Sequence, residues 1–567
     1  MVSFSDLFVA ASRASARDSA LAFGLLGIFF NIAIQGVEFE LYMYHFMAIS
    51  ISLYWGLIFT VYSVADYGIL TAFARVSLLY ASFGFSLMTS MVCYRLFFHR
   101  LCRFPGPVWA KITRFHASSL AAKNIQYYKE LAKLHAQYGD FVRTGPREIS
   151  ILRPEAADVI YGPQSECRKS TWYGGSSNDP NKCSVNMTRD FAQHRLRRRA
   201  WDRAFSMKAL STYQPRVKAK ADLLIDQLRK RSDRPIDITT WAMFFGFDVM
   251  GDLGFSKEFY NLESGVEHHA IKAIHKHMTT MAVVSMTPWL LNILGSIPGA
   301  AAAFSGFFDF CGSEIKAKQK SWDGEQYPRD ITSWLLKAVK ENDPSASPSQ
   351  ESLDDDSRVV IIAGSDTSAT VLANTMYFLA KHPDKQRKVQ TLLDRAMPGG
   401  YTAWSYDKVK TVTYVDDIIN ETLRLRPPVV MAMPRETPAK GIRVGDVHIP
   451  GGANVLMPLH QLQRDKRWWQ QGEDWIPERW GERRHEMGTD GAPWLPFSLG
   501  AFGCSGKNLG YLNMRTSISS IVMNFDVAFV EGEDDEAFYD GALDTLTMTL
   551  PPLKLKFTAR GSVDGRD

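Results

Sequence analysis

The stretch FSLGAFGCSG, residues 497–506, places a single cysteine, Cys504, in a loop with three glycines. Glycine has no side chain and lets a backbone approach a neighbouring group closely. A cysteine kept for packing would more naturally lie inside a helix or strand. The loop therefore predicts a backbone that passes close to something large and flat, with the sulfur as the group that reaches out.

Composition narrows the class of protein. Of the 567 residues, 46% are hydrophobic and 22% charged, so the chain can bury a sizeable core and is not globally disordered. The net charge is only +5, which does not indicate a general nucleic-acid surface. The six cysteines have no paired spacing, which argues against a disulfide framework and a CxxC zinc site.

The N-terminal region predicts a membrane anchor. Three windows without Asp, Glu, Lys or Arg, each long enough to cross a bilayer, occupy residues 19–37, 41–65 and 76–94. The first window also carries Asn31 and Gln35, so the number of spans is left open at two or three. A basic flank follows the third window and predicts that the rest of the chain lies on the cytoplasmic side; it consists of Arg95, Arg100, Arg103, Lys111 and Arg114. With three spans the N-terminus would be lumenal, which Arg13 and Arg17 mildly oppose.

The rest of the chain predicts a mainly α fold with small β-sheets. Residues 138–152 read as two short strands around a Gly-Pro turn. Helical periodicity covers residues 191–210, 357–381 and 408–425. The uncharged, proline-broken residues 278–308 predict either a helix pair or a loop that dips into the bilayer surface. Residues 341–357 are polar and acidic and predict a solvated loop.

The basic segment DFAQHRLRRRAWDRAFS, residues 190–206, contains five arginines. A solvated basic face is the default interpretation and an RNA-binding arm the alternative. Helical spacing puts four of its residues on one stripe: His194, Arg198, Trp201 and Phe205. Arg198 is thus expected to point inward and the other arginines outward. An inward arginine needs an anion, and no nearby carboxylate obviously serves.

Three further motifs precede the cysteine loop. AGSDTS, residues 363–368, puts a glycine, an acid and hydroxyls inside an apolar helix. Either its Ser and Thr bond back to helix carbonyls while Asp366 faces water, or a ligand presses against the helix at Gly364. Glu421 and Arg424 in ETLRLRPP share a helix face. PRETP and WIPERW, residues 434–438 and 475–480, supply Arg435 and Arg479.

In this order the motifs resemble the cytochrome P450 family of haem-thiolate monooxygenases, with a closer likeness to fungal microsomal members of secondary metabolism. The resemblance covers nearly all of residues 104–560 and implies the cytochrome P450 fold preceded by transmembrane helices. It implies five segments: a tail (1–18), an anchor of two or three transmembrane helices (19–94), a basic flank with the proline hinge FPGP (95–115), a haem-thiolate catalytic domain (116–560) and a second tail (561–567).

The resemblance also implies roles for individual residues. Cys504 would be the thiolate ligand of the iron of haem b, in a loop marked by Phe497, Gly500 and Gly506. Gly364 would leave space for dioxygen, and Asp366 with Thr367 would relay protons. Arg198 and Arg435 would meet the haem propionates. Glu421, Arg424 and Arg479 would form the structural Glu-Arg-Arg triad.

Two positions depart from the family pattern. The loop usually carries an arginine two residues before the cysteine, where this chain has Phe502, and His194 replaces the tryptophan of the basic helix. The departures indicate altered anchoring of the propionates and leave more of that task to Arg198 and Arg435.

The resemblance implies an NADPH-dependent cytochrome P450 reductase as partner, O2, membrane lipid, and no nucleic acid. The protein would lie in the endoplasmic reticulum membrane with a cytosolic catalytic domain. Segments that match the family's pocket are residues 172–185, 362–363, 429–433 and 545–546, although core packing explains each side chain as well. Their apolar character favours a hydrophobic metabolite of terpenoid, prenylated indole or polyketide type. The alternatives are a haem-thiolate isomerase or dehydratase and a non-catalytic haem-binding protein.

Overall fold

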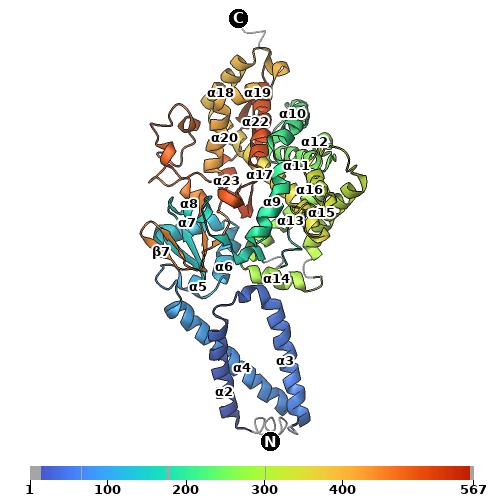
Figure 1. Cartoon of the computed structure of the whole chain (residues 1–567). Coiled ribbons are helices and arrows are strands. Elements are labelled where there is room, and N and C mark those ends of the chain that lie inside the picture. Colours follow the sequence, from blue (N-terminus) through green and yellow to red (C-terminus); the bar gives the residue numbers. More distant parts are fainter. Residues whose placement is uncertain (1–13, 65–66, 175–178, 300–301, 562–567) are drawn as a thin grey trace.

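The computed structural model describes residues 14–64, 67–174, 179–299 and 302–561. It shows three long apolar helices joined to a larger, mainly helical domain with small β-sheets, which we call the main domain (residues 99–561; Figure 1). The prediction of a mainly α fold with small sheets is confirmed. Parts of the expected terminal tails, residues 1–13 and 562–567, lie outside the described residues.

Three helices form the N-terminal bundle: α2 (Ala16–Ile34), α3 (Met43–Val64) and α4 (Ile69–Cys93). A short 3-10 helix, η1 (Phe39–Tyr42), precedes α3, and a π-helical turn, η2 (Tyr94–Phe98), follows α4. All three are long and apolar enough to cross a membrane. Each therefore matches one of the uncharged windows in the sequence.

Helices α2 and α4 pack side by side in the same direction. The hydroxyl of Ser82 donates to the carbonyl of Ala20, and the Asn31 amide donates to Ser90 Oγ at 2.9 Å. Gly27 lies so close to the backbone of Phe83 that an added Cβ would sit 2.5 Å from its carbonyl oxygen. Small residues at such a contact let apolar helices approach closely.

The turn between α2 and α3 contacts the main domain. Glu38 accepts two hydrogen bonds from the guanidinium of Arg189, at 2.8 and 2.9 Å, and Glu40 accepts one from Thr171 at 3.2 Å. The ends of α2 and α4 near the main domain therefore lie on one side of the bundle, and the start of α2 lies on the other (Figure 1).

Helices make up most of the main domain. Its α-helices are α5 (Val108–Ile112), α6 (Phe115–Asn124), α7 (Tyr127–Tyr138), α8 (Ala156–Tyr161), α9 (Phe191–Ala204), α10 (Met207–Arg229), α11 (Ile238–Phe255), α12 (Asn261–Ser264), α13 (His269–Val284), α14 (Pro288–Ser296), α15 (Ala302–Ser321), α16 (Ile331–Lys340), α17 (Gln350–Lys381), α18 (Pro383–Ala396), α19 (Tyr406–Thr411), α20 (Thr413–Leu425), α21 (Leu459–Leu462), α22 (Lys507–Asn524) and α23 (Asp535–Asp540). Short 3-10 helices are η3 (Thr171–Gly174), η4 (Gly400–Ala403), η5 (Pro477–Trp480), η6 (Thr489–Gly491) and η7 (Gly500–Phe502).

The strands form four small sheets. The largest has the order β1 (Phe141–Gly145), β2 (Glu148–Ile151), β8 (Asn454–Leu456), β5 (Arg435–Glu436) and β3 (Arg168–Lys169). The others are β4 (Ile236–Asp237) with β12 (Lys554–Ala559) and β9 (Phe525–Phe529), β6 (Ile442–Val444) with β7 (Val447–Ile449), and β10 (Leu543–Thr545) with β11 (Thr547–Thr549). β1 and β2 are the two strands predicted around the Gly-Pro turn. In the antiparallel pair β3–β5, Lys169 lies opposite Arg435.

The core is built around α17, which packs against α11. Two glycines allow the close approach: a Cβ on Gly246 would sit 2.6 Å from the Ser365 carbonyl oxygen, and one on Gly364 would sit 2.3 Å from Met250 Sδ. The helical cost of a mid-helix glycine, about 1 kcal/mol relative to alanine, is thus offset here by helix packing.

Two sequence predictions in this region have different outcomes. The solvated loop expected at residues 341–357 is wrong from Gln350 onward, because Ser349 caps α17 and the helix starts there. Asp356 of this acidic run is fully buried. Between residues 278 and 308, the structure has a helix pair, α13 and α14, that meets at a bend of 119°, a geometry that also fits a segment dipping into the bilayer surface. Residues 300 and 301 lie outside the described part of the chain.

Candidate active site

The cysteine loop leaves the sulfur of Cys504 accessible rather than packed in the core. The Cys504 N–H donates to the Phe497 carbonyl at 2.9 Å, which closes the loop, and α22 begins directly after Gly506. Gly500 has φ +61°, and a Cβ there would sit 2.6 Å from the Tyr161 carbonyl oxygen, so only glycine fits. The Cys504 side chain is exposed and free.

The electrostatic surroundings of Cys504 act in two directions. Desolvation by nearby protein raises the pKa of the thiol, while the N–H groups of Gly506 and Lys507 and the charges of Arg198 and Lys507 work against this rise. A helix N-terminus and nearby cations stabilise a thiolate, which forms when a cysteine loses its proton on binding a metal ion.

The basic helix α9 holds this loop. It is capped by Asp190, and Arg198 donates one hydrogen bond to the Gly503 carbonyl at 2.7 Å and another to Asp202 at 2.7 Å. Arg198 is therefore turned toward the loop, as the stripe in the sequence predicts, and it touches the residue next to Cys504.

The expectation that the remaining arginines of this helix face outward is wrong for Arg197. This side chain is buried and forms an ion pair of 2.9 Å with Asp356 near the start of α17. The reason is that the buried face of α9 is centred on Arg197, Ala200 and Ala204 as well as on His194. The expectation that no nearby carboxylate serves Arg198 is also wrong, because Asp202 pairs with it from four residues further along the helix. The partner of Arg197, Asp356, lies in the acidic run that the sequence placed in solvent.

A cluster of cations surrounds Phe502, two residues before Cys504. Arg435 and Lys169 each lie 5.0 Å from the centroid of its ring, and the His194 ring lies 4.8 Å from it. Arg435 is 2% exposed and Lys169 is 3% exposed. Within the described residues, neither forms an ion pair with a carboxylate.

His194 is neutral in this environment. Burial lowers the pKa of its imidazole to about 3, and the charges of Lys169, Arg198, Arg197 and Arg435 act in the same direction. Burial, followed by the charge of Arg435, also holds the pKa of Lys169 well below its ordinary value. The cluster therefore carries more positive charge than its protein surroundings balance.

The AGSDTS segment lies within α17, and only one part of the first interpretation made from the sequence is found, the hydrogen bonds from Ser and Thr back to helix carbonyls. Ser365 and Thr367 donate back to the carbonyls of Ile361 and Ala363, at 2.6 and 2.7 Å. Asp366 does not face water, because only 4% of it is exposed. It lines a cavity with Met243 of α11 and Met548 of β11. No ligand is needed to explain Gly364, which packs against Met250.

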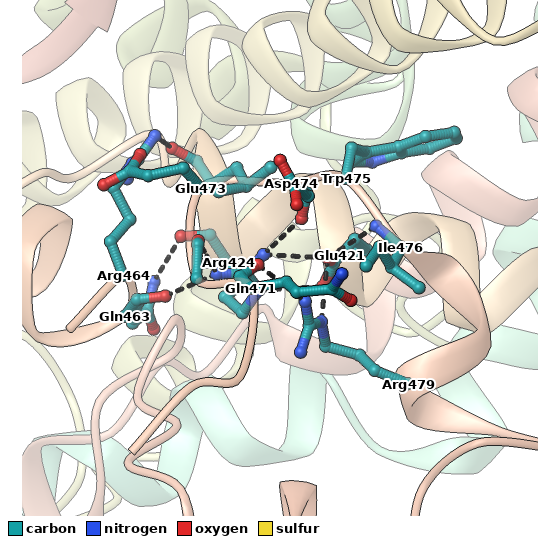
Figure 2. Close-up of polar contacts among 12 residues, drawn as sticks. Glu421, Arg424, Gln463, Arg464, Gln471, Glu473, Asp474, Trp475, Ile476 and Arg479 are labelled. Atoms are coloured by element: carbon teal, nitrogen blue, oxygen red, sulfur yellow. Dashed lines mark hydrogen bonds and ion pairs between the residues drawn. The ribbon is translucent and has the colours of Figure 1, made fainter. Parts of the chain in front are cut away.

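The Glu421, Arg424 and Arg479 triad is assembled in a fully buried site (Figure 2). Glu421 pairs with Arg424 at 2.8 Å and with Arg479 at 2.9 Å. The Ile476 N–H and the Trp480 indole N–H also donate to this carboxylate. Burial opposes its ionisation, but these partners hold the pKa of Glu421 below its ordinary value.

The two arginines use their remaining donors on backbone carbonyls. Arg424 donates to the carbonyls of Gln463, Gly472 and Asp474, and Arg479 to those of Gln470 and Gln471. The triad thereby ties α20 to the loop that precedes η5, and it makes no contact with the cysteine loop in the bonds shown (Figure 2).

A second cavity lies near the anchor end of the main domain. Several of its lining residues come from segments that match the family's pocket: Trp172, Val429, Met431, Ala432, Met433 and Leu546. Its lining does not include Ile362 or Ala363 of α17. Residues 175–178 of the expected segment lie outside the described residues. The ion pair Arg114–Glu148 and the buried Asp544 add polar groups to this mostly apolar lining.

Three charged residues of these sites were missed in the sequence. Lys169 stands in RKSTWYG without any motif, Asp356 is hidden in an acidic run, and Asp544 precedes the Thr545-Leu546 turn that was singled out. Burial raises the pKa of Asp544 to about 7. Only Asp544 carried a signal in the sequence, as an aspartate inside a mostly apolar segment.

These features fit a flat metal-bearing group with two carboxylates. The exposed thiol supplies one soft ligand for iron, and the buried cations Lys169 and Arg435 supply positive charge that no carboxylate of the described residues balances. The loop between them contains glycines at the points of closest approach. Haem, an iron porphyrin with two propionates, has this combination of groups.

The comparisons with known proteins agree. The cytochrome P450 family model matches residues 105–557, and the chain belongs to this family. It is 37% identical to cytochrome P450 monooxygenase orf5 of Eupenicillium brefeldianum over 86% of the chain and 97% of that protein. It is 35% identical to cytochrome P450 monooxygenase sthD of Phaeosphaeria nodorum, over 84% of the chain and 99% of that protein. It is 33% identical to tryprostatin B 6-hydroxylase of Aspergillus fumigatus, over 86% of the chain and 85% of that protein.

Membership in this family confirms the resemblance seen in the sequence. The chain is a haem-dependent oxidoreductase of the cytochrome P450 type, similar to fungal monooxygenases of secondary metabolism.

Proposed function

We propose that this protein is a membrane-anchored monooxygenase that inserts one oxygen atom of O2 into a hydrophobic secondary metabolite, with electrons from NADPH through a cytochrome P450 reductase. One observation carries the proposal: the exposed sulfur of Cys504 lies in a loop flanked by two buried cations, Lys169 and Arg435, that form no ion pair with any carboxylate of the described residues. The family and the fungal relatives support the reaction class.

Haem b would be held through Cys504 as the iron ligand and through Arg435 at the propionates. When bound, a haem with a thiolate ligand supplies oxygen activation and favours O–O cleavage. Arg198 would act mainly on the loop, because one of its bonds goes to the Gly503 carbonyl and its other partner is Asp202. Phe497 would support the sulfur through the hydrogen bond from the Cys504 N–H to its carbonyl.

Asp366 and Thr367 would deliver protons. Asp366 lines a pocket between α11, α17 and β11, and Thr367 lies one residue further along α17, where its hydroxyl oxygen can accept a hydrogen bond from water. Gly364 would leave space for dioxygen beside the helix, because it has no side chain, and it also packs against Met250.

The anchor would cross the endoplasmic reticulum membrane three times, with a lumenal N-terminus and a cytosolic catalytic domain. The parallel packing of α2 along α4 supports this count, because a helix that runs beside a spanning helix over its length spans the same layer. The bonds of Glu38 and Glu40 to the main domain support a cytosolic turn between α2 and α3. The basic flank from Arg95 onward agrees with this orientation.

The substrate would enter the cavity near the anchor. Its lining from Trp172, Val429 and Met431 favours an apolar molecule, and Asp544 offers one polar contact. One relative is named for hydroxylation of tryprostatin B. A terpenoid, prenylated indole or polyketide is therefore the proposed substrate class.

The CO difference spectrum of the reduced full-length protein tests the iron ligand. We expect a band near the position of thiolate-ligated haem in the parent protein and in the control Cys102→Ala, whose thiol is exposed elsewhere. Cys504→Ser should lose that band together with NADPH-dependent oxygen consumption in the presence of a reductase. A haem protein that keeps the band but consumes neither NADPH nor O2 would be an isomerase, a dehydratase or a binding protein, and would contradict the proposal.

Coupling tests the proton relay. Thr367→Ala should keep NADPH consumption but divert it to peroxide. Thr391→Ala is the matched control, since its hydroxyl also donates to the carbonyl four residues earlier but on exposed α18. Equal peroxide yields in the two variants would contradict the role of Thr367.

A further inference from the structure

Two buried cations face each other across a strand pair beside the cysteine loop. Lys169 of β3 and Arg435 of β5 are register partners in an antiparallel ladder. Like charges in directly opposite positions destabilise such a pair, and a buried ammonium without an anion is costly. A protein keeps this arrangement where something else supplies the negative charge.

The neutral partners of the two cations do not supply it. Lys169 Nζ donates to the carbonyls of Val185 and Asn186, at 3.2 and 2.7 Å. Arg435 Nη1 donates to the Tyr173 hydroxyl at 2.9 Å. Carbonyl and hydroxyl oxygens satisfy donors but carry no net charge, so these partners leave the two basic side chains without a balancing anion.

Phe502 explains why the second cation is there. It occupies the loop position at which the family usually carries an arginine, and both Lys169 and Arg435 contact its ring at 5.0 Å from the centroid. The loop itself thus contributes no charge. The strand β3 contributes one instead, through Lys169 next to the same ring.

We propose that Lys169 is a haem-anchoring residue that replaces the loop arginine: its ammonium and the Arg435 guanidinium, both next to the ring of Phe502, together balance the two propionates. The proposal rests on the proposed haem function. Two cations then face two propionates. The other basic residues nearby add no charge to this comparison, because Arg198 is already paired with Asp202 and His194 is neutral.

The rate of haem release tests this role without any substrate. The full-length protein in detergent is mixed with excess apomyoglobin, and transfer of haem is followed by absorbance. Lys169→Gln keeps a donor for the nearby carbonyls but removes the charge. We expect release about 10- to 100-fold faster, the effect of losing one charge-assisted contact. Lys440→Gln is the control, because this lysine is exposed and pairs only with Glu166 at the surface.

Haem dimethyl ester separates anchoring from damage to the fold. Its propionates carry no charge, so the parent protein and Lys169→Gln should release it at the same rate. Lys169→Met should likewise release haem faster than the parent protein and release the dimethyl ester at the same rate. This second variant guards against an effect that comes from the glutamine side chain itself.

Two results would overturn the proposal: an unchanged rate of haem release in Lys169→Gln, or an equal acceleration with haem and with its dimethyl ester. Failure of the proposed function looks different, because the parent protein would then show no thiolate-ligated haem at all.

Discussion

Two buried clusters of charge in this chain are built in opposite ways. In the triad, one carboxylate, Glu421, meets two arginines, and each guanidinium nitrogen donates to a protein acceptor. Beside the cysteine loop, Lys169 and Arg435 lie opposite one another next to an aromatic ring, with no carboxylate of the described residues as partner. The first cluster is complete within the protein, whereas the second is complete only with an anionic ligand. The difference separates a structural centre from a binding centre.

Two further buried acids extend this comparison. Asp356 has a single arginine, and burial raises its pKa even though Arg197 opposes the rise. Within the described ranges of the chain, Asp544 has no cation among its hydrogen-bond partners, and burial raises its pKa to about 7. The degree of charge balance therefore decreases from Glu421 to Asp356 to Asp544. The loss in the free energy of unfolding on removal of each acid should decrease in the same order.

The largest effect is expected for Glu421→Gln. This change leaves Arg424 and Arg479 buried without an anion, which costs about 3 to 5 kcal/mol. Because such a loss is comparable to the whole stability of many domains, we expect almost no folded full-length protein in membranes. The measurement is the yield of monodisperse, haem-loaded protein after extraction.

The matched control is Glu325→Gln, which removes an acid that is exposed and pairs with Lys340. Its yield should equal that of the parent. Normal yield and thermal midpoint for Glu421→Gln would show that the triad is not a structural centre.

A smaller loss is expected for Asp356→Asn. The amide oxygen can still accept from the Val185 N–H, but the charge opposite Arg197 is lost. We expect about 1 to 3 kcal/mol of destabilisation, seen as a lower thermal midpoint of the full chain. Asp354→Asn, in the same helix turn but partly exposed and paired with Lys316, should stay close to the parent. Equal midpoints for the two variants would contradict the assigned pair.

The sequence predicted features that depend on local pattern and missed those that depend on distant pairing. The cysteine loop, the β1–β2 hairpin and the Glu421–Arg424 spacing each lie within a short segment. The partner of Arg197 lies near the start of α17, and the partner of Lys169 across the ladder lies in β5. Neither pair has a local signal, because helix packing and strand register bring the residues together. Gly364 was noticed, but its contact with Met250 required the position of α11.

Phe502→Arg sharpens the comparison by adding a charge to the unbalanced cluster. A third cation next to Lys169 and Arg435 should lower the thermal midpoint of the full chain prepared without haem, by an amount equivalent to about 2 kcal/mol. The double variant Phe502→Arg with Lys169→Met should recover most of this loss, since the number of cations returns to two. Phe502→Leu is the control for loss of the ring alone. If removing Lys169 brings no recovery, the two positions do not share one charge balance.

The smallest loss of stability on removal of an acid is expected for Asp544, which has no cation among its hydrogen-bond partners in the described residues. Its signature is instead a dependence of stability on pH. In the folded protein burial raises its pKa to about 7, while the ordinary value is 3.8. Between these values the unfolded chain is ionised and the folded chain is protonated, so the free energy of unfolding should fall as pH rises from about 4 to 7 and level off above 7. The slope is at most about 1.4 kcal/mol per pH unit.

Asp544→Asn removes this titration, so the thermal midpoint of the parent relative to this variant should fall from pH 5.5 to 7 and then remain constant. Asp540→Asn, an exposed acid just before the same hairpin, should instead run parallel to the parent over the whole range. If the thermal midpoints of the parent and of Asp544→Asn change in parallel with pH, the pKa of this carboxyl is not raised by folding. A falling curve would instead identify a protonated acid in the apolar cavity, able to donate a hydrogen bond to a carbonyl or hydroxyl oxygen of the substrate.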